Sequence, residues 1–150
     1  MGLGGLVLNL SKPLLNLLNL SKPFYMKTYS FEKLIVWQKA RKLAVVIYKT
    51  TREFPKDELF GMTSQMRRCS ISIPSNIAEG SGRQNPKDKA RFTEIAYSSA
   101  LELLNQLIIS IDLEYISEEN YLKIRIEIEE ITYMLDSLRK SQLKSVDGVS

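Results

Sequence analysis

The sequence predicts an all-α protein, an antiparallel up-down-up-down four-helix bundle over residues 26–143. Apolar residues recur at spacings of three and four in four successive segments, which is the period of an amphipathic helix. The connections between these segments are short and contain proline, glycine, serine or asparagine, which favours antiparallel neighbours. No segment shows a competing strand pattern. A chain of 150 residues has room for one such domain with a sizeable core.

The first predicted helix covers residues 31–53 and ends before Pro55. Its apolar stripe consists of Leu34, Trp37, Ala40, Ala44, Ile47, Thr51 and Phe54. Most of its charges fall on the other face, namely Lys39, Arg41, Lys42, Lys49 and Arg52. The pattern therefore predicts one buried and one basic side for this helix.

The second predicted helix starts at Asp57 or Gly61 and ends at Glu79, before the turn Gly80-Ser81-Gly82. Its stripe consists of Leu59, Met62, Met66, Cys69, Ile73 and Ile77. Pro74 removes a backbone donor inside the helix, which predicts a kink between Ser70 and Pro74. The polar side chains around it, Ser70, Ser72, Ser75 and Asn76, are expected to bond either to freed backbone groups or to a neighbouring helix.

Asn85-Pro86 is the N-cap and first-turn proline of a third helix that runs to about Asp112. Its stripe consists of Phe92, Ile95, Ala96, Ser99, Leu103, Leu107 and Ile111. Ser117 is the predicted N-cap of the fourth helix, which fades near Ser141. The fourth stripe, the most regular in the chain, consists of Tyr121, Ile124, Ile128, Ile131, Leu135 and Leu138.

The first and fourth helices have more apolar surface than one bundle core needs. The surplus residues are Ile35, Val36, Val45, Val46, Leu122, Ile126 and Met134. Surplus apolar helix faces are typical of subunit contacts, so the sequence predicts a homo-oligomer.

Residues 1–25 contain a ten-residue direct repeat in which Leu-Asn-Leu-Ser-Lys-Pro occurs at 8–13 and again at 18–23. We expect this segment to be an extension that is either disordered or wrongly assigned to the protein, with Met26 as the authentic start; the alternative is a short docking arm. Its apolar runs are too short and interrupted to span a membrane. Residues 144–150 are expected to form a disordered tail.

Composition excludes several classes of function. The chain has one cysteine, Cys69, and no histidine, which excludes intramolecular disulfides, tetrahedral zinc sites and histidine-based triads. We therefore expect no catalytic residues, no metal, no cofactor and no enzymatic activity, and a reducing, cytoplasmic location. Cys69 lies on an apolar stripe and is interpreted as a small buried hydrophobic residue.

Charge is divided unevenly along the chain. Residues 26–91 contain 14 Lys/Arg and 6 Asp/Glu, a net charge of +8, whereas residues 92–143 contain 4 and 10, a net charge of −6. The candidate nucleic-acid contacts flank the turn between the second and third helices and are Arg67, Arg68, Arg83, Lys87, Lys89 and Arg91. They are hypothesised to form one basic end of the bundle; the alternative is charge pairing with the acidic fourth helix.

One glycine-rich segment and three single residues also need an interpretation. The segment Gly80-Ser81-Gly82-Arg83 is either a plain turn or an anion cradle, and it lacks the ending of a phosphate-binding loop. Asn76 and Glu79 are predicted as buried polar residues of a structural network. Trp37 is expected to pack in the core or in a subunit contact.

Three segments resemble a known family: Leu34–Ala40, Leu59–Arg68 and Ser72–Gly80. Within them, Trp37, Pro74, Asn76, Glu79 and Gly80 form the structural motif. The chain resembles the intervening-sequence proteins of bacterial 23S ribosomal RNA, over about residues 26–143. The resemblance implies a four-helix bundle that assembles as a ring-like homopentamer, without enzymatic activity. It also implies a relative, the accessory protein of diversity-generating retroelements, that binds nucleic acid and a reverse transcriptase.

Two functional hypotheses follow. The first is a non-catalytic oligomer that associates with RNA or DNA through its basic half. The second is a protein-interaction scaffold, or an accessory subunit that docks a partner enzyme such as a reverse transcriptase. No membrane partner is expected. The identity of the nucleic acid or partner protein and the cellular process stay open.

Overall fold

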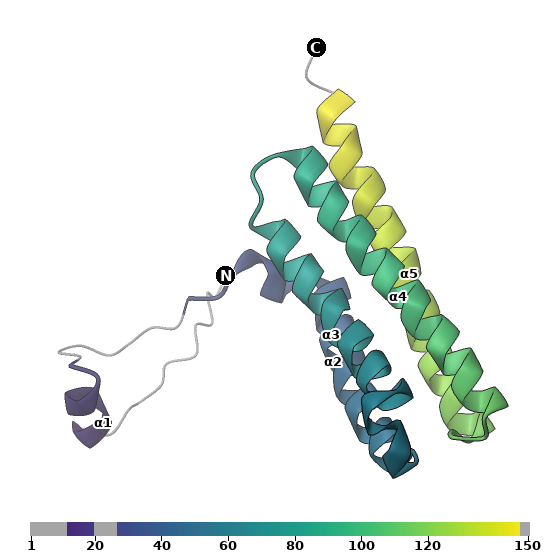
Figure 1. The fold of residues 1–150 in the computed structure, drawn as a ribbon. Helices are drawn as coiled ribbons and strands as arrows, with labels where there is room; N and C mark the ends of the chain where they lie inside the picture. Colours follow the sequence, from purple (N-terminus) through teal and green to yellow (C-terminus); the bar gives the residue numbers. More distant parts are fainter. Residues whose placement is uncertain (1–11, 20–26, 148–150) are drawn as a thin grey trace. The chain divides into compact units, whose positions relative to one another are not determined.

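Four long helices make up most of the chain in the computed structural model, which describes residues 12–19 and 27–147 (Figure 1). They are α2 (Ile35–Thr50), α3 (Met62–Ser81), α4 (Pro86–Asp112) and α5 (Glu118–Asp147). Three short 3₁₀ segments accompany them: η1 (Ser30–Lys33), η2 (Thr51–Glu53) and η3 (Lys56–Phe60). No strand occurs in these described ranges, and the predicted all-α class is confirmed.

The four helices enclose one hydrophobic core. Helix α3 packs against both α2 and α4, and α5 packs against α4 and returns to α2. The largest fully buried apolar side chains come from all four helices: Leu43, Ile47, Met66, Ile73, Leu103, Leu107, Ile128, Ile131 and Leu135. Most of the predicted stripe positions are therefore core positions.

Three predictions about apolar side chains were wrong. Val36 was assigned to the surplus surface, yet it is buried. It lies four residues before Ala40 and seven before Leu43, so it begins the regular buried row of α2, which a stripe drawn through Leu34 and Trp37 misses. Leu59 lies in η3, which Gly61 separates from α3, and is exposed. Ile95 lies beside the buried row that contains Ala96 and is also exposed.

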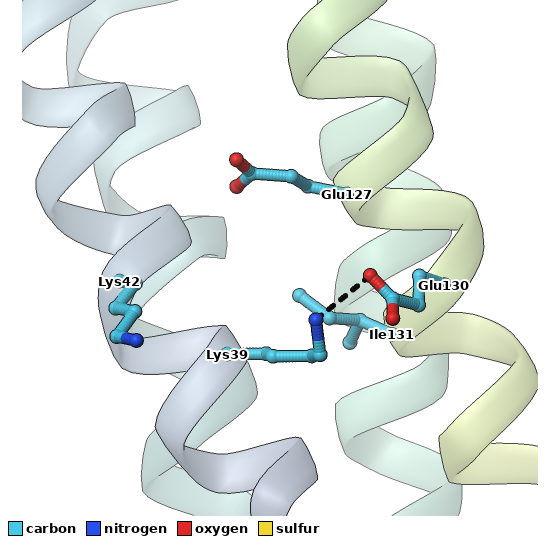
Figure 2. Close-up of a pocket in the computed structure, with 5 residues that line it drawn as sticks. All are labelled: Lys39, Lys42, Glu127, Glu130 and Ile131. Atoms are coloured by element: carbon cyan, nitrogen blue, oxygen red, sulfur yellow. Dashed lines mark hydrogen bonds and ion pairs between the residues drawn. The ribbon is translucent and has the colours of Figure 1, made fainter.

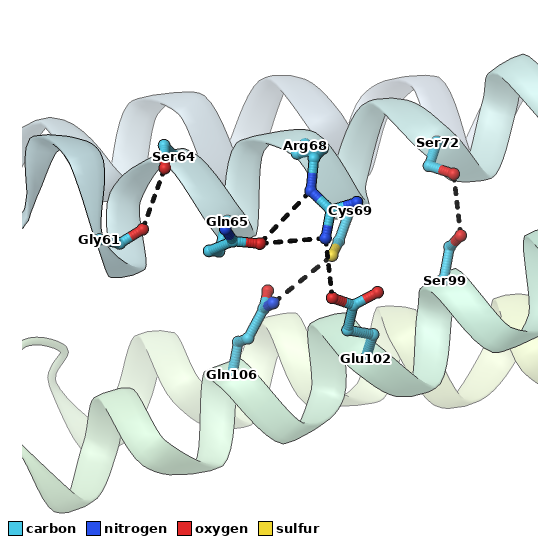
Figure 3. Close-up of polar contacts among 9 residues, drawn as sticks. All are labelled: Gly61, Ser64, Gln65, Arg68, Cys69, Ser72, Ser99, Glu102 and Gln106. Atoms are coloured by element: carbon cyan, nitrogen blue, oxygen red, sulfur yellow. Dashed lines mark hydrogen bonds and ion pairs between the residues drawn. The ribbon is translucent and has the colours of Figure 1, made fainter.

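Helix α3 keeps Pro74 inside it and extends two residues beyond the predicted end. Asn76 is half-buried, and its Nδ2 donates to the carbonyl oxygen of Ser72 at 2.8 Å and to the Ser72 hydroxyl at 3.1 Å. That hydroxyl also bonds to Ser99 of α4 at 2.8 Å (Figure 3). The polar residues near Pro74 thus bond both to local backbone and to the neighbouring helix, whereas the predicted kink stays a prediction.

Gly80 lies within α3 rather than after it, at a position where α3 passes very close to α4. A Cβ added at Gly80 would stand 2.8 Å from the Cβ of Phe92 and 3.4 Å from the carbonyl oxygen of Lys89. Because neither atom is the free end of a flexible side chain, only glycine lets the two backbones approach this closely. Glu79, predicted to be buried, is exposed on the outer side of the same turn. The carboxylate of Glu79 pairs with Arg83, so that prediction was wrong.

The predicted caps of α4 and α5 are present. The Asn85 side chain accepts a hydrogen bond from the Lys87 amide at 2.9 Å, and Pro86 is the first residue of α4. The Ser117 hydroxyl accepts from the Asn120 amide at 3.3 Å at the start of α5. Helix α5 then continues to Asp147, so residues 144–147 of the expected tail are helical. Residues 148–150 lie outside the described part of the chain.

The N-terminal segment forms its own unit, residues 1–30. Within it, Lys12–Leu17 form a short helix, α1, and Lys27 lies over the Tyr29 ring at 5.2 Å. The expectations for the remainder of the repeat and for Met26 fall on residues 1–11 and 20–26, outside the described residues.

Candidate nucleic-acid interface

The six cations predicted to form one basic end do not lie together. Arg67 and Arg68 lie in the first half of α3, whereas Arg83, Lys87, Lys89 and Arg91 surround the connection from α3 to α4. At about 1.5 Å of rise per residue, Arg68 is about 20 Å along the helix axis from Ser81. The prediction of a single basic cluster was therefore wrong, because the arginine pair lies too far from the turn.

Two of the six cations are already neutralised by carboxylates. Arg68 donates to Glu102 of α4 at 3.0 Å and to the Gln65 side chain at 3.0 Å (Figure 3). Arg83 pairs with Glu79 one helical turn earlier, and its guanidinium lies 4.6 Å from the Phe92 ring centre. Lys87, Lys89 and Arg91 form no ion pair within the described residues.

The glycine-rich connection does not offer free amides to an anion. The Gly82 amide donates to the Glu79 carbonyl and the Arg83 amide donates to the Gly80 carbonyl, both at 3.1 Å. Because these donors already close the end of α3, the geometry favours the plain-turn interpretation of this segment.

A row of unpaired cations on α2 and the following η2 was not among the predicted nucleic-acid contacts. We define the basic face as Arg41 and Lys49 of α2 and Arg52 of η2, with Lys56 of η3 at its end. None of them lies within ion-pair distance of a carboxylate in the part of the chain that the structure describes. On α5, in contrast, Lys123, Arg125 and Lys140 each pair with a carboxylate four residues away. The basic face therefore retains its charge, whereas α5 neutralises much of its own.

A groove of about 400 Å³ runs along the basic face between α2 and α3. Arg41, Lys49 and Arg52 line it together with the apolar residues Ala44, Val45, Tyr48, Ile71 and Pro74. The Tyr48 side chain is 40% exposed, and the Arg67 guanidinium lies 4.9 Å from the centre of its ring. At the other end, Arg41 lies 5.2 Å from the ring centre of Trp37, which also packs against Phe31. Cations interleaved with aromatic rings suit phosphates and bases together.

None of the six predicted cations pairs with the acidic last helix in the described residues, and the charge pairing that does join α2 to α5 involves Lys39 instead. A pocket of about 250 Å³ between α2 and α5 is lined by Lys39, Lys42, Glu127, Glu130 and Ile131 (Figure 2). Lys39 donates to Glu130 at 2.9 Å. Since two carboxylates face two lysines, this pocket balances its own charge and offers little to a phosphate.

The described residues present no cluster of metal-ligating side chains. No group of three or more His, Cys, Asp or Glu residues that could hold a metal ion occurs among them. Cys69 is buried as predicted, and burial raises the pKa of its thiol above the usual value. The thiol therefore stays protonated at neutral pH and unsuited to nucleophilic chemistry.

The fold and this surface can be compared with known proteins. The model of the 23S rRNA-intervening sequence protein family matches residues 32–137. The chain belongs to this family. Its match spans all four long helices except the last turns of α5, and the N-terminal segment lies outside it.

A solved structure of the same kind supports the assignment. A protein of unknown function from the S23 ribosomal protein family of Bacteroides thetaiotaomicron is 32% identical, and the similarity covers 71% of this chain and 99% of that one, with a TM-score of 0.65. The search of curated proteins gave no match. Among the described residues of this intervening-sequence protein, no helix combines the length and the apolar composition that a membrane span requires.

Proposed function

We propose that this intervening-sequence protein is a non-catalytic homo-oligomer that associates with nucleic acid through the basic face. The observation that supports the proposal most directly is the row of cations without carboxylate partners beside an apolar and aromatic groove. Phosphate contacts release condensed counterions, so unpaired surface cations contribute more to nucleic-acid affinity than cations already held in ion pairs.

We also propose the antiparallel up-down-up-down topology for the bundle. Contacts between α3 and α4 run in opposite chain directions, since Arg68 meets Glu102 and Ser72 meets Ser99. Contacts between α4 and α5 do the same, since Thr93 meets Gln142 and Glu94 meets Arg139. Reversed order is what antiparallel neighbours require.

Salt dependence tests the association with nucleic acid. Labelled single-stranded RNA and DNA oligonucleotides are titrated with the full-length protein while fluorescence anisotropy is measured between about 50 and 200 mM salt. We expect affinity to fall steeply with salt, by about 0.7 logarithmic units per contacted phosphate per decade of salt. The absence of binding at the lowest salt would overturn the proposal.

The oligomer is supported by a second apolar row on α5. Leu122, Ile126 and Tyr133 are exposed and lie on the helix face opposite the buried row of Ile124, Ile128, Ile131 and Leu135. Among the surplus residues predicted from the sequence, Ile35, Val45, Leu122 and Ile126 are exposed, whereas Val46 and Met134 pack partly against the core. We propose self-association through such faces, with five copies as the family resemblance implies.

Ile126→Asp is expected to shift the protein toward monomers, because a carboxylate cannot be buried in an apolar contact without a partner. Sedimentation velocity measures the shift, and circular dichroism verifies that the helices are retained. Ser141→Asp places the same charge elsewhere on the exposed surface of α5 and should leave the assembly unchanged. A monomeric wild-type protein would contradict the oligomer itself.

The apolar floor of the groove favours one alternative, the docking of a protein segment or partner enzyme. Val45 and Ile71 are exposed between the cations, as a groove for an amphipathic acidic helix requires. Such a complex depends on apolar burial as well as charge, so it should lose less affinity with salt than a nucleic-acid complex.

A further inference from the structure

A second hollow, of about 340 Å³, lies where the end of α2 passes into α3. We call it the Arg67 hollow. Three cations line it, Arg52, Lys56 and Arg67, together with two threonines, Thr51 and Thr63, and three apolar residues, Phe54, Pro55 and Leu59. No carboxylate is among its lining residues. A concentration of positive charge and hydroxyl groups around one hollow indicates an anionic ligand.

The Arg67 side chain is held in place without a counterion. Its Nε donates to the Thr51 hydroxyl at 2.9 Å, and that hydroxyl in turn donates to the Ile47 carbonyl at 2.8 Å. The Tyr48 ring packs against the guanidinium. Arg67 is half-buried, yet it forms no ion pair, and its two Nη groups form no hydrogen bond, within the part of the chain that the structure describes. The guanidinium is therefore fixed in orientation with its outer donors available.

The Thr63 hydroxyl is the second unusual group. Thr63 is only 3% exposed, and no hydrogen bond of its hydroxyl occurs among the described residues. Other buried hydroxyls of the helices are satisfied: Thr51, Thr93 and Ser110 each donate to the backbone carbonyl four residues earlier. Among the described residues, the fully buried side-chain polar atoms that lack a partner are Gln106 Oε1 and Arg139 Nε, and the Thr63 oxygen is not one of them. The Thr63 hydroxyl therefore remains accessible at the lining of the Arg67 hollow and can donate to a ligand there.

Three acidic residues neighbour the lining residues in the sequence, Glu53, Asp57 and Glu58, and none of them lines the hollow. Glu58 is held by other groups. Glu58 accepts from the Met62 amide at 2.8 Å, which caps α3, and from the Tyr115 hydroxyl at 3.0 Å. It is not a lining residue of the hollow. The carboxylate thus neutralises the start of α3 and leaves Arg67, Arg52 and Lys56 to the ligand.

We propose that the Arg67 hollow binds one phosphate group, with the Arg67 guanidinium and the Thr63 hydroxyl as donors and Arg52 and Lys56 as additional charge. This inference rests on the proposed function and deepens it, since the phosphate belongs to the bound nucleic acid. The hollow adjoins the groove through Arg52, which lines both. A strand along the basic face can therefore place one of its phosphates in the hollow.

The test uses Thr63→Val, Arg67→Gln and the control Arg68→Gln in the full-length protein. Inorganic phosphate binding is measured by isothermal titration calorimetry, and RNA binding by anisotropy. We expect Thr63→Val and Arg67→Gln each to weaken phosphate binding by about tenfold to a hundredfold, the usual effect of losing a hydrogen bond to a charged group. Arg68→Gln removes the same charge from the adjacent residue, which Glu102 already pairs, and should retain wild-type affinity.

Thermal unfolding of Thr63→Val separates a ligand role from a structural one. Because the hydroxyl has no partner in the free protein, we expect the midpoint to stay the same or rise. A lower midpoint, or unchanged phosphate affinity in this variant, would overturn the proposal. Arg67→Gln also loses the hydrogen bond to Thr51, so this variant alone does not separate a ligand role from a structural one. Thr63→Val is therefore measured beside it.

The two measurements also separate this inference from the proposed function. Phosphate binding that Thr63→Val weakens, without any RNA binding, would support the hollow and contradict the nucleic-acid proposal. RNA binding that neither Thr63→Val nor Arg67→Gln changes, without phosphate binding, would overturn the hollow and leave the basic face supported.

Discussion

Replacing Arg41, Lys49 and Arg52 together by glutamine is expected to weaken single-stranded nucleic-acid binding by about a hundredfold at about 0.1 M salt. Each phosphate contact contributes about 0.7 logarithmic units of affinity per decade of salt concentration. From about 1 M to about 0.1 M salt, one decade, the loss of three contacts therefore removes about two logarithmic units of affinity. The slope of the logarithm of affinity against the logarithm of salt concentration should become shallower by about two units. Anisotropy titrations at several salt concentrations measure both quantities.

The matched control replaces Lys123, Arg125 and Lys140 of α5 by glutamine. It removes the same formal charge, but each of these cations is paired with a carboxylate in the wild-type protein. We expect the control to change affinity much less than the α2 variant. Equal losses in the two variants would show that net charge, rather than the basic face, governs binding, and an unchanged slope in the α2 variant would contradict the interface.

Ile128→Ala is expected to lower the free energy of unfolding by about 3 kcal/mol. Ile128 is 0% exposed and packs in the core formed by all four helices. Truncation removes buried methyl groups and leaves a cavity that a packed core closes only partly. Urea denaturation followed by circular dichroism measures the change at a fixed protein concentration.

Ile126→Ala supplies the comparison, two residues away on the same helix. Ile126 is 64% exposed, so within the folded subunit its truncation should change stability by about 0.5 kcal/mol or less. If Ile126 also lies in a subunit contact, its effect should grow as protein concentration rises, because association stabilises the folded state by mass action. Equal destabilisation by the two variants would contradict the assignment of inner and outer faces of α5.

The helices could be predicted from the sequence because each depends on local spacing. The caps Asn85 and Ser117 act on amides two and three residues away, and both were correctly identified. The errors have two sources. Leu59 belongs to η3, so extending the regular stripe of α3 back through it gives the wrong face. Val36 lies on the regular buried row of α2, but the predicted stripe was drawn through Leu34 and Trp37 instead.

The interface was harder to predict because charge pairing is not local. Arg67 and Arg68 are identical neighbours in the sequence, but one lies beside Tyr48 and Thr51 of the preceding segment and the other meets Glu102 of α4. Only the packing of α3 between its two neighbours separates an available cation from a neutralised one. A signal did exist along α2 and η2, where Arg41, Val45, Tyr48 and Arg52 follow helical spacing on the side away from the core.

Trp37 gives the basic face an intrinsic optical reporter. It is the only tryptophan in the chain, and its indole ring lies beneath Arg41 at one end of the groove. When Arg41 turns toward a phosphate, the polarity and quenching around the indole change with it. Emission from the unlabelled protein can therefore follow occupancy of the groove directly, without a dye on either partner.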